Sequence, residues 1–132
     1  MELYLGGCFQ GKLSYVTEKY QNLSVWEGED LSTNSKELWE QLGDLKSPII
    51  NHFQNLIRSC LINHVHPMIL TQEIVARYPD VIIICDEVGN GIVPIDPQES
   101  EYREQTGRVQ IFLAKRAERV ERIICGISQQ LK

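Results

Sequence analysis

The sequence lacks any apolar run long enough to cross a membrane, and its N-terminus has no cleavable leader pattern. We therefore expect a cytoplasmic protein without a membrane partner. Positive charge is also scarce, because 13 Lys and Arg stand against 18 Asp and Glu and give a formal net charge of −5. The two signs are interspersed, so the sequence predicts no basic face and no nucleic-acid partner.

Cysteine is sparse and forms no recognisable pair. The chain has no CxxC pair and no spacing typical of a zinc site, which indicates reduced thiols at Cys8, Cys60, Cys85 and Cys125. Cys85 and Cys125 lie in apolar strand-like runs, where cysteine behaves as a small buried hydrophobe. Cys8 is interpreted as a tolerated small residue, with a reactive thiol as the alternative.

The length and composition are those of one ordinary globular domain. The 132 residues are 42% hydrophobic and 23% charged, and they contain no internal repeat or low-complexity tract. We expect a single domain over residues 1–132, and its N-terminal glycine-rich segment predicts that this domain binds a nucleotide.

A short apolar run, Leu3 to Leu5, leads into a glycine-rich segment with the spacing of a phosphate-binding P-loop. In such a loop, backbone N–H groups surround phosphate oxygens, the following helix contributes its dipole, and a lysine contacts the β/γ-phosphates. The predicted nucleotide-binding residues are Gly6, Gly7, Cys8, Phe9, Gln10, Gly11, Lys12 and Leu13. Leu13 stands where a P-loop has the Ser or Thr that holds Mg²⁺, so the sequence supports nucleotide binding better than nucleotide chemistry. A glycine-rich turn without a ligand is the alternative.

Strand-like and helix-like segments alternate along the chain, which predicts an α/β layer fold with a mainly parallel sheet. The expected strands are residues 2–5, 23–26, 81–85 and 122–125, and the expected helices are 13–20, 35–42, 48–62, 67–78 and 97–119. Pro48, Pro67 and Pro97 each stand at an expected first helical turn, where the missing N–H is tolerated. The run Val81 to Cys85 is typical of a central strand that is covered on both faces.

Asp86 and Glu87 follow this central strand directly. Ligands of open parallel sheets lie beyond the carboxyl ends of the strands, so both side chains are expected to face the glycine-rich segment. An apolar strand that ends in carboxylates is typical of a magnesium-binding element, with Asp86 as the candidate ligand. The alternative is that Asp86 caps a turn and Glu87 is solvated.

The stretch Glu-Val-Gly-Asn-Gly-Ile-Val-Pro, residues 87–94, precedes Tyr-Arg-Glu at 102–104 and Gly-Arg-Val-Gln at 107–110. Together with the N-terminal segment, these motifs resemble the adenosylcobinamide kinase/adenosylcobinamide-phosphate guanylyltransferase family of cobalamin biosynthesis. The resemblance covers residues 1–20 and 68–132, whereas 21–67 match poorly. Gly89, Gly91 and Pro94 match the second motif, and Gly107 matches the third. Gln110 and Ile111 replace the Asn-Gln of that third motif.

The resemblance implies a P-loop NTPase-like three-layer sandwich and a homo-oligomer. It implies that GTP or ATP, with Mg²⁺, phosphorylates adenosylcobinamide, and that GMP is then transferred to the product through a guanylylated histidine. On this interpretation Lys12 and Glu87 are catalytic, and Asp86, Glu87, Arg103 and Arg108 contact substrate or phosphate. Leu13 in place of the hydroxyl ligand departs from the family pattern.

The histidine step has no matching segment in this chain. The histidines His52, His64 and His66 all lie outside an Arg- and Trp-containing segment of the family type. The pair His64 and His66 provides too few ligands for a metal without partners, so all three are interpreted as polar residues at helix ends. Two hypotheses remain: a kinase-type phosphotransferase without the guanylyl-histidine, or an inactive homologue that acts in binding, sensing or assembly.

Overall fold

The computed structural model describes residues 1–88 and 95–132. Their strands form one six-stranded sheet in the order β2-β3-β4-β1-β5-β6. All neighbouring pairs are parallel except β5 and β6, which form an antiparallel hairpin at one edge. The strands are β1 (Glu2–Gly6), β2 (Val25–Glu27), β3 (Ile49–Asn51), β4 (Ile82–Asp86), β5 (Arg119–Ile124) and β6 (Ile127–Gln130).

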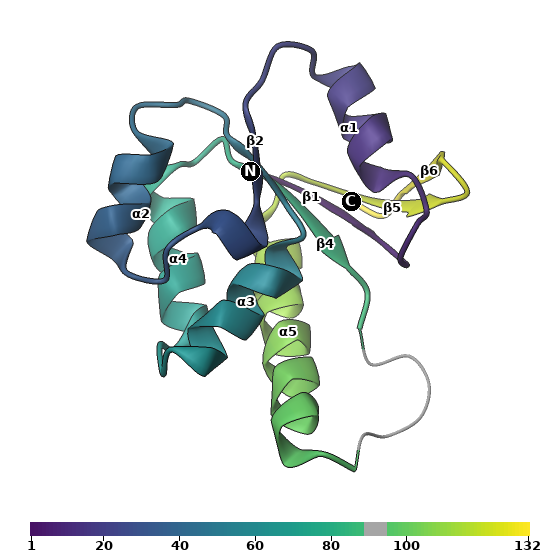
Figure 1. Ribbon diagram of the computed structural model, residues 1–132. Coiled ribbons are helices and arrows are strands. Elements are labelled where there is room, and N and C mark those ends of the chain that lie inside the picture. The colour runs from purple at the N-terminus through teal and green to yellow at the C-terminus, as the bar shows by residue number, and fades with distance from the viewer. Residues whose placement is uncertain (89–94) are drawn as a thin grey trace.

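The sheet is the middle of three layers, as Figure 1 shows. Helix α1 (Lys12–Lys19) covers one face, where Val16 packs against Tyr4, Ile84 and Ile123 of the sheet. The larger core lies on the other face, which is covered by α2 (Ser35–Leu42), α3 (Phe53–Ile62), α4 (Pro67–Arg77) and α5 (Pro97–Arg116). The predicted α/β sandwich with a mainly parallel sheet is confirmed.

Local sequence explains how most of the helices begin. The side chain of Asn34 accepts a hydrogen bond from Glu37 N at the start of α2, and Asp96 accepts one from Gln98 N at the start of α5. His66 caps α4 in the same way, because its Nδ1 accepts from Met68 N. Pro67 and Pro97 occupy first helical turns, as the sequence predicts.

The prediction of a single helix over residues 48–62 is wrong. Ile49–Asn51 forms β3, which pairs with β2 and β4, and α3 begins only at Phe53. His52 between them has φ of +52°, which turns the chain sharply from the strand into the helix. Ile49 and Ile50 are both fully buried. A short apolar run that is buried all round has no alternation with polar residues, so its sequence pattern does not distinguish a strand from a helix.

The C-terminal end also differs from expectation. β5 begins at Arg119 instead of Arg122, and β6 is not among the strands expected from the sequence. Cys125 was expected to be buried in a strand, but it is exposed in the turn of the hairpin, where it and Gly126 have φ of +52° and +74°. Cys60 and Cys85 are buried, as predicted for Cys85. No described helix combines the length and the apolar character needed to cross a bilayer.

Candidate functional site at the carboxyl edge of the sheet

The residues from Gly6 to Lys12, named the glycine-rich loop from this point, connect the end of β1 to the start of α1. A Cβ at Gly6 would lie 2.5 Å from the carbonyl oxygen of Ile123, so only glycine fits there. Gly11 has φ of +85°, a backbone conformation that favours glycine. The path of the loop therefore favours glycine at both positions.

Lys12 is the charged residue at the end of this loop, and only 6% of its side chain is exposed. Its Nζ donates to the carbonyl oxygen of Gly7 at 2.6 Å and lies 2.8 Å from Asp86 Oδ1. The structure thus brings Lys12, at the start of α1, to Asp86, the last residue of β4, which is a neighbour of β1 in the sheet. A phosphate that binds in the loop would replace the Gly7 carbonyl as a partner of this ammonium group.

Two glutamine side chains hold the backbone of Asp86 in position. Gln54 of α3 accepts a hydrogen bond from Asp86 N at 3.0 Å, and Gln110 of α5 donates to Asp86 O at 2.8 Å. The carboxylate is therefore presented to Lys12 by contacts from both helices. Neither glutamine is predicted from the sequence as a site residue, although Gln110 lies in the third motif, where it departs from the family pattern.

Glu87 does not face the loop alongside Asp86. Its carboxylate pairs with Arg122 of β5, with Oε1 2.7 Å from Nε and Oε2 3.1 Å from Nη2. The expectation that both carboxylates project toward the loop is thus met by Asp86 alone. The pair reaches across the end of β1, because β4 and β5 are the two neighbours of that strand.

Leu13 is partly buried against the smaller core under α1, which contains Tyr4 and Val16. Its side chain therefore supports packing and offers no oxygen to a cation. The carboxylate of Asp86 suits Mg²⁺, a hard cation that is commonly held by one or two carboxylates with water and phosphate oxygens. The site fits this ion in part, since one of the two usual protein oxygens is missing.

The two arginines that the resemblance assigns to phosphate lie on α5. Arg108 is 64% exposed and pairs with Glu104 at 2.7 Å, one helical turn away. Arg103 is half-buried and has its own interaction within the protein. The ion pair of Arg108 is therefore within α5 and includes neither Lys12 nor Asp86. Gly89, Gly91 and Pro94 of the second motif lie outside the described residues.

The turn of the β5–β6 hairpin contacts the glycine-rich loop directly. The backbone N–H of Gly126 donates to Gln10 O at 2.8 Å, and that of Cys125 donates to Gln10 Oε1 at 2.7 Å. The neighbouring Phe9 is 99% exposed and has φ of +59°. The loop is therefore fixed on one side by the hairpin and open to solvent on the other.

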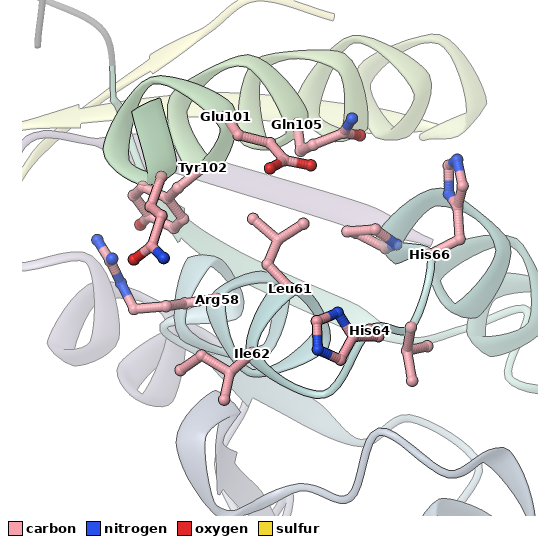
Figure 2. Close-up of a pocket in the computed structure, with 11 residues that line it drawn as sticks. Arg58, Leu61, Ile62, His64, His66, Glu101, Tyr102 and Gln105 are labelled. Carbon is pink, nitrogen blue, oxygen red and sulfur yellow. The ribbon is translucent and has the colours of Figure 1, made fainter. Parts of the chain in front are cut away.

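A cavity of about 810 Å³ lies between α3, the start of α4 and α5, away from the glycine-rich loop. Figure 2 shows His64 and Leu61 on one side and Glu101, Tyr102 and Gln105 of α5 on the other. At its end, the guanidinium of Arg58 stacks 3.8 Å from the ring centre of Tyr102. The lining is mixed apolar and polar, and it contains neither Lys12 nor Asp86.

Cys85 lies beside Asp86, but its chemistry is that of a core residue. Burial raises the pKa of the Cys85 thiol to about 12, and burial also raises that of Cys60 to about 11. Both remain protonated at neutral pH, so neither is a nucleophile or a thiolate ligand.

The model of the cobinamide kinase/cobinamide phosphate guanyltransferase family matches residues 18–131. The match includes Asp86, Glu87, the third motif and the hairpin, and it begins after the glycine-rich loop. Comparison with individual curated proteins gave no match. The middle region, which resembles the family poorly by inspection, lies inside the matched range.

Proposed function

Because the chain belongs to the cobinamide kinase/cobinamide phosphate guanyltransferase family, we propose that it binds GTP or ATP in the glycine-rich loop and phosphorylates adenosylcobinamide. The observation that carries this proposal is the position of Lys12, whose ammonium group lies between the Gly7 carbonyl and the Asp86 carboxylate. A buried lysine at the first position of a helix that follows a glycine-rich loop is suited to binding transferring phosphate.

Each charged group would have a separate part in this reaction. Lys12 would leave the Gly7 carbonyl and stabilise negative charge on the transferred phosphoryl group. Asp86 would hold Mg²⁺, which when bound would supply positive charge against the phosphates. Glu87 would orient the acceptor hydroxyl only after separation from Arg122, so its proposed role is the less direct one. Arg103 and Arg108 remain candidates for contact with phosphate.

We further propose that the chain does not form a guanylyl-histidine. His52 follows β3, two strands away from β1 in the sheet, which corresponds to roughly 10 Å at the usual strand spacing. His64 and His66 lie at the cavity between α3 and α5. Incubation with GTP labelled at the α-phosphate should therefore give no acid-labile label on the protein. A label that maps to one of these histidines would contradict the proposal.

Phosphoryl transfer is tested with adenosylcobinamide and nucleotide labelled at the γ-phosphate. The expected result is a labelled corrinoid product that requires Mg²⁺ and is absent with Lys12→Ala. Lys36→Ala is the matched control, because Lys36 is an exposed lysine of α2. A product formed equally well by Lys12→Ala would remove the lysine from the mechanism.

A second candidate is an inactive homologue that senses nucleotide or corrinoid, or that acts in assembly. The observation that favours it is Leu13, whose side chain fills the small core where the family has a hydroxyl ligand. Nucleotide binding without any phosphorylated product, in the same assay, would select this candidate.

A further inference from the structure

We propose that Glu27, Glu29 and His52 form a binding site for a divalent transition-metal ion, with Zn²⁺ as the preferred ion. One ligand atom from each of the three side chains lies within 4.8 Å of the other two. They are the one such group of His, Cys, Asp or Glu among residues 1–88 and 95–132. The site is distinct from the Mg²⁺ position at Asp86.

The three ligands come from two segments that are packed tightly together. Glu27 ends β2, Glu29 lies in the short 3₁₀ turn Gly28–Asp30, and His52 follows β3. A Cβ on Gly28 would lie 2.2 Å from the carbonyl oxygen of His52, so only glycine lets the turn approach the start of α3 this closely. This approach places one carboxylate on each side of the glycine next to the imidazole.

The imidazole of His52 and the carboxylate of Glu27 already face each other, as two ligands of one metal ion do. His52 Nδ1 lies 2.8 Å from Glu27 Oε2, a distance at which a proton on Nδ1 is donated to the carboxylate. A metal ion that replaces this proton would bind Nδ1 and the carboxylate together. Imidazole nitrogen and carboxylate oxygen are both ordinary ligands of Zn²⁺, and three protein ligands leave a fourth position open.

Amide side chains hold both carboxylates from behind. Asn51, which is only 3% exposed, donates from Nδ2 to Glu27 Oε1 at 3.0 Å and to Oε2 at 3.2 Å. Asn55 donates from Nδ2 to Glu29 Oε2 at 3.1 Å. Hydrogen bonds of this kind orient metal-binding carboxylates and are typical of sites that exist before the ion arrives. Buried Asn51 thus holds Glu27 firmly, whereas Glu29 and its hydrogen bond with Asn55 are exposed.

The charge at this position is not balanced by a permanent cation. Among the described residues, the ion pairs of Glu27 and Glu29 include His52 but no lysine or arginine. Two carboxylates and a neutral imidazole would carry a net charge of −2, which a divalent ion neutralises. The alternative histidines lack this arrangement, because Figure 2 shows His64 and His66 at a cavity with only Glu101 as an acidic lining residue.

The site lies at the carboxyl edge of the sheet, where α/β proteins bind their ligands. β2 and β3 are the third and second strands from β1, so the ion would lie roughly 10 to 15 Å from the glycine-rich loop. That separation is too large for direct contact with the same phosphate. Metal binding is therefore expected without any nucleotide.

The test is a calorimetric titration of the chelator-treated full chain with Zn²⁺, under reducing conditions and without nucleotide, with bound metal counted by elemental analysis. We expect one Zn²⁺ per chain, and a loss of affinity of about tenfold or more in Glu27→Gln and His52→Asn. The matched controls are Glu101→Gln and His64→Asn, since His64 also has positive φ, of +57°. Both controls should bind as the unaltered chain does.

Other outcomes are equally decisive. The absence of stoichiometric binding, or affinity unchanged in Glu27→Gln, would overturn the site, and so would equal losses in the His64→Asn control. Asn tolerates the backbone conformation of residue 52, but if His52→Asn fails to fold, Glu27→Gln and its control decide the question. Lys12→Ala should bind Zn²⁺ normally, so failure of the proposed kinase function would not affect this result.

Discussion

Gly6 lies where the end of β1 passes the carbonyl of Ile123 and the side chain of Lys12. A methyl group at Gly6 would approach that carbonyl oxygen to 2.5 Å and the Lys12 Cδ to 3.3 Å. The backbone must move to relieve the first contact, because a carbonyl in a central strand has no freedom to turn away. This close approach explains why the glycine-rich loop begins with glycine.

We predict that Gly6→Ala lowers the free energy of unfolding by about 2 to 3 kcal/mol, through overpacking against the strand. Gly107→Ala is the control, because its Cβ would meet no atom within 4 Å and it lies inside α5. That change should raise stability by about 0.5 to 1 kcal/mol. Denaturant unfolding measures both, and equal stabilities of Gly6→Ala and the unaltered chain would contradict the close approach.

Leu13 offers a second test at a single residue. Leu13→Ser should lower stability by about 1 to 2 kcal/mol, since it removes a partly buried side chain from the core under α1. The new hydroxyl should also strengthen nucleotide binding in the presence of Mg²⁺, if the absence of this ligand limits the site. Leu13→Ala loses the same packing without adding an oxygen, so the two variants should differ in Mg²⁺-dependent affinity but little in stability. Identical nucleotide affinities would count against a cation at this position.

Among the elements, the sequence predicts the central strand, α4 and the start of α5 well, because each has a local signal. Val81 to Cys85 is a continuous β-branched run, and Pro67 and Pro97 mark first helical turns. β3 escaped prediction because its three residues are buried on all sides and the helix follows after one residue. β6 was not predicted, because the one turn residue before it, Gly126, was not interpreted as part of a hairpin.

The contact between α1 and β5 depends on a buried carboxylate. Burial alone would raise the pKa of Glu121, but hydrogen bonds from Ser128, Tyr15, Arg119 and Lys19 bring it well below its ordinary value. Lys19 Nζ lies 2.9 Å and Tyr15 Oη 2.6 Å from this carboxylate, so α1 is tied to the strand through it. The charge on Glu121 therefore stabilises the folded chain.

We predict that this stabilisation disappears in acid. A carboxyl whose pKa is lowered by folding stabilises the protein above its unfolded pKa of about 4.3, and loses that effect as pH falls toward its folded pKa. The difference in unfolding free energy between the unaltered chain and Glu121→Gln should thus be largest near pH 7 and shrink below about pH 4. Urea unfolding across this range measures it. Glu118→Gln, at an exposed position, is the control, and a difference that does not vary with pH would argue against the network.

The whole molecule brings together groups that no local pattern connects. Lys12, Asp86 and Gln110 are far apart in the chain, and they meet because β1 and β4 are neighbours and α5 packs beneath them. The sequence could place Lys12 and Asp86 at the same sheet edge from motif and strand alone. It could not show that Glu87 pairs with Arg122, or that Glu27 and His52 meet, because both depend on strand order. The formation of a homo-oligomer stays a prediction, which a measurement of molecular mass in solution tests.

The central claim is that the glycine-rich loop binds nucleotide through Lys12, and calorimetric titration with GTP and ATP, each with and without Mg²⁺, tests it most directly. We expect saturable binding of at least one nucleotide, weakened in Lys12→Ala by about 30-fold, the equivalent of a charged hydrogen bond of about 2 kcal/mol. Lys12→Met keeps most of the apolar part of the buried side chain, so it separates the loss of the charge from a folding defect. Lys36→Ala should bind nucleotide normally. Binding of neither nucleotide, or equal binding by Lys12→Met, would contradict the claim.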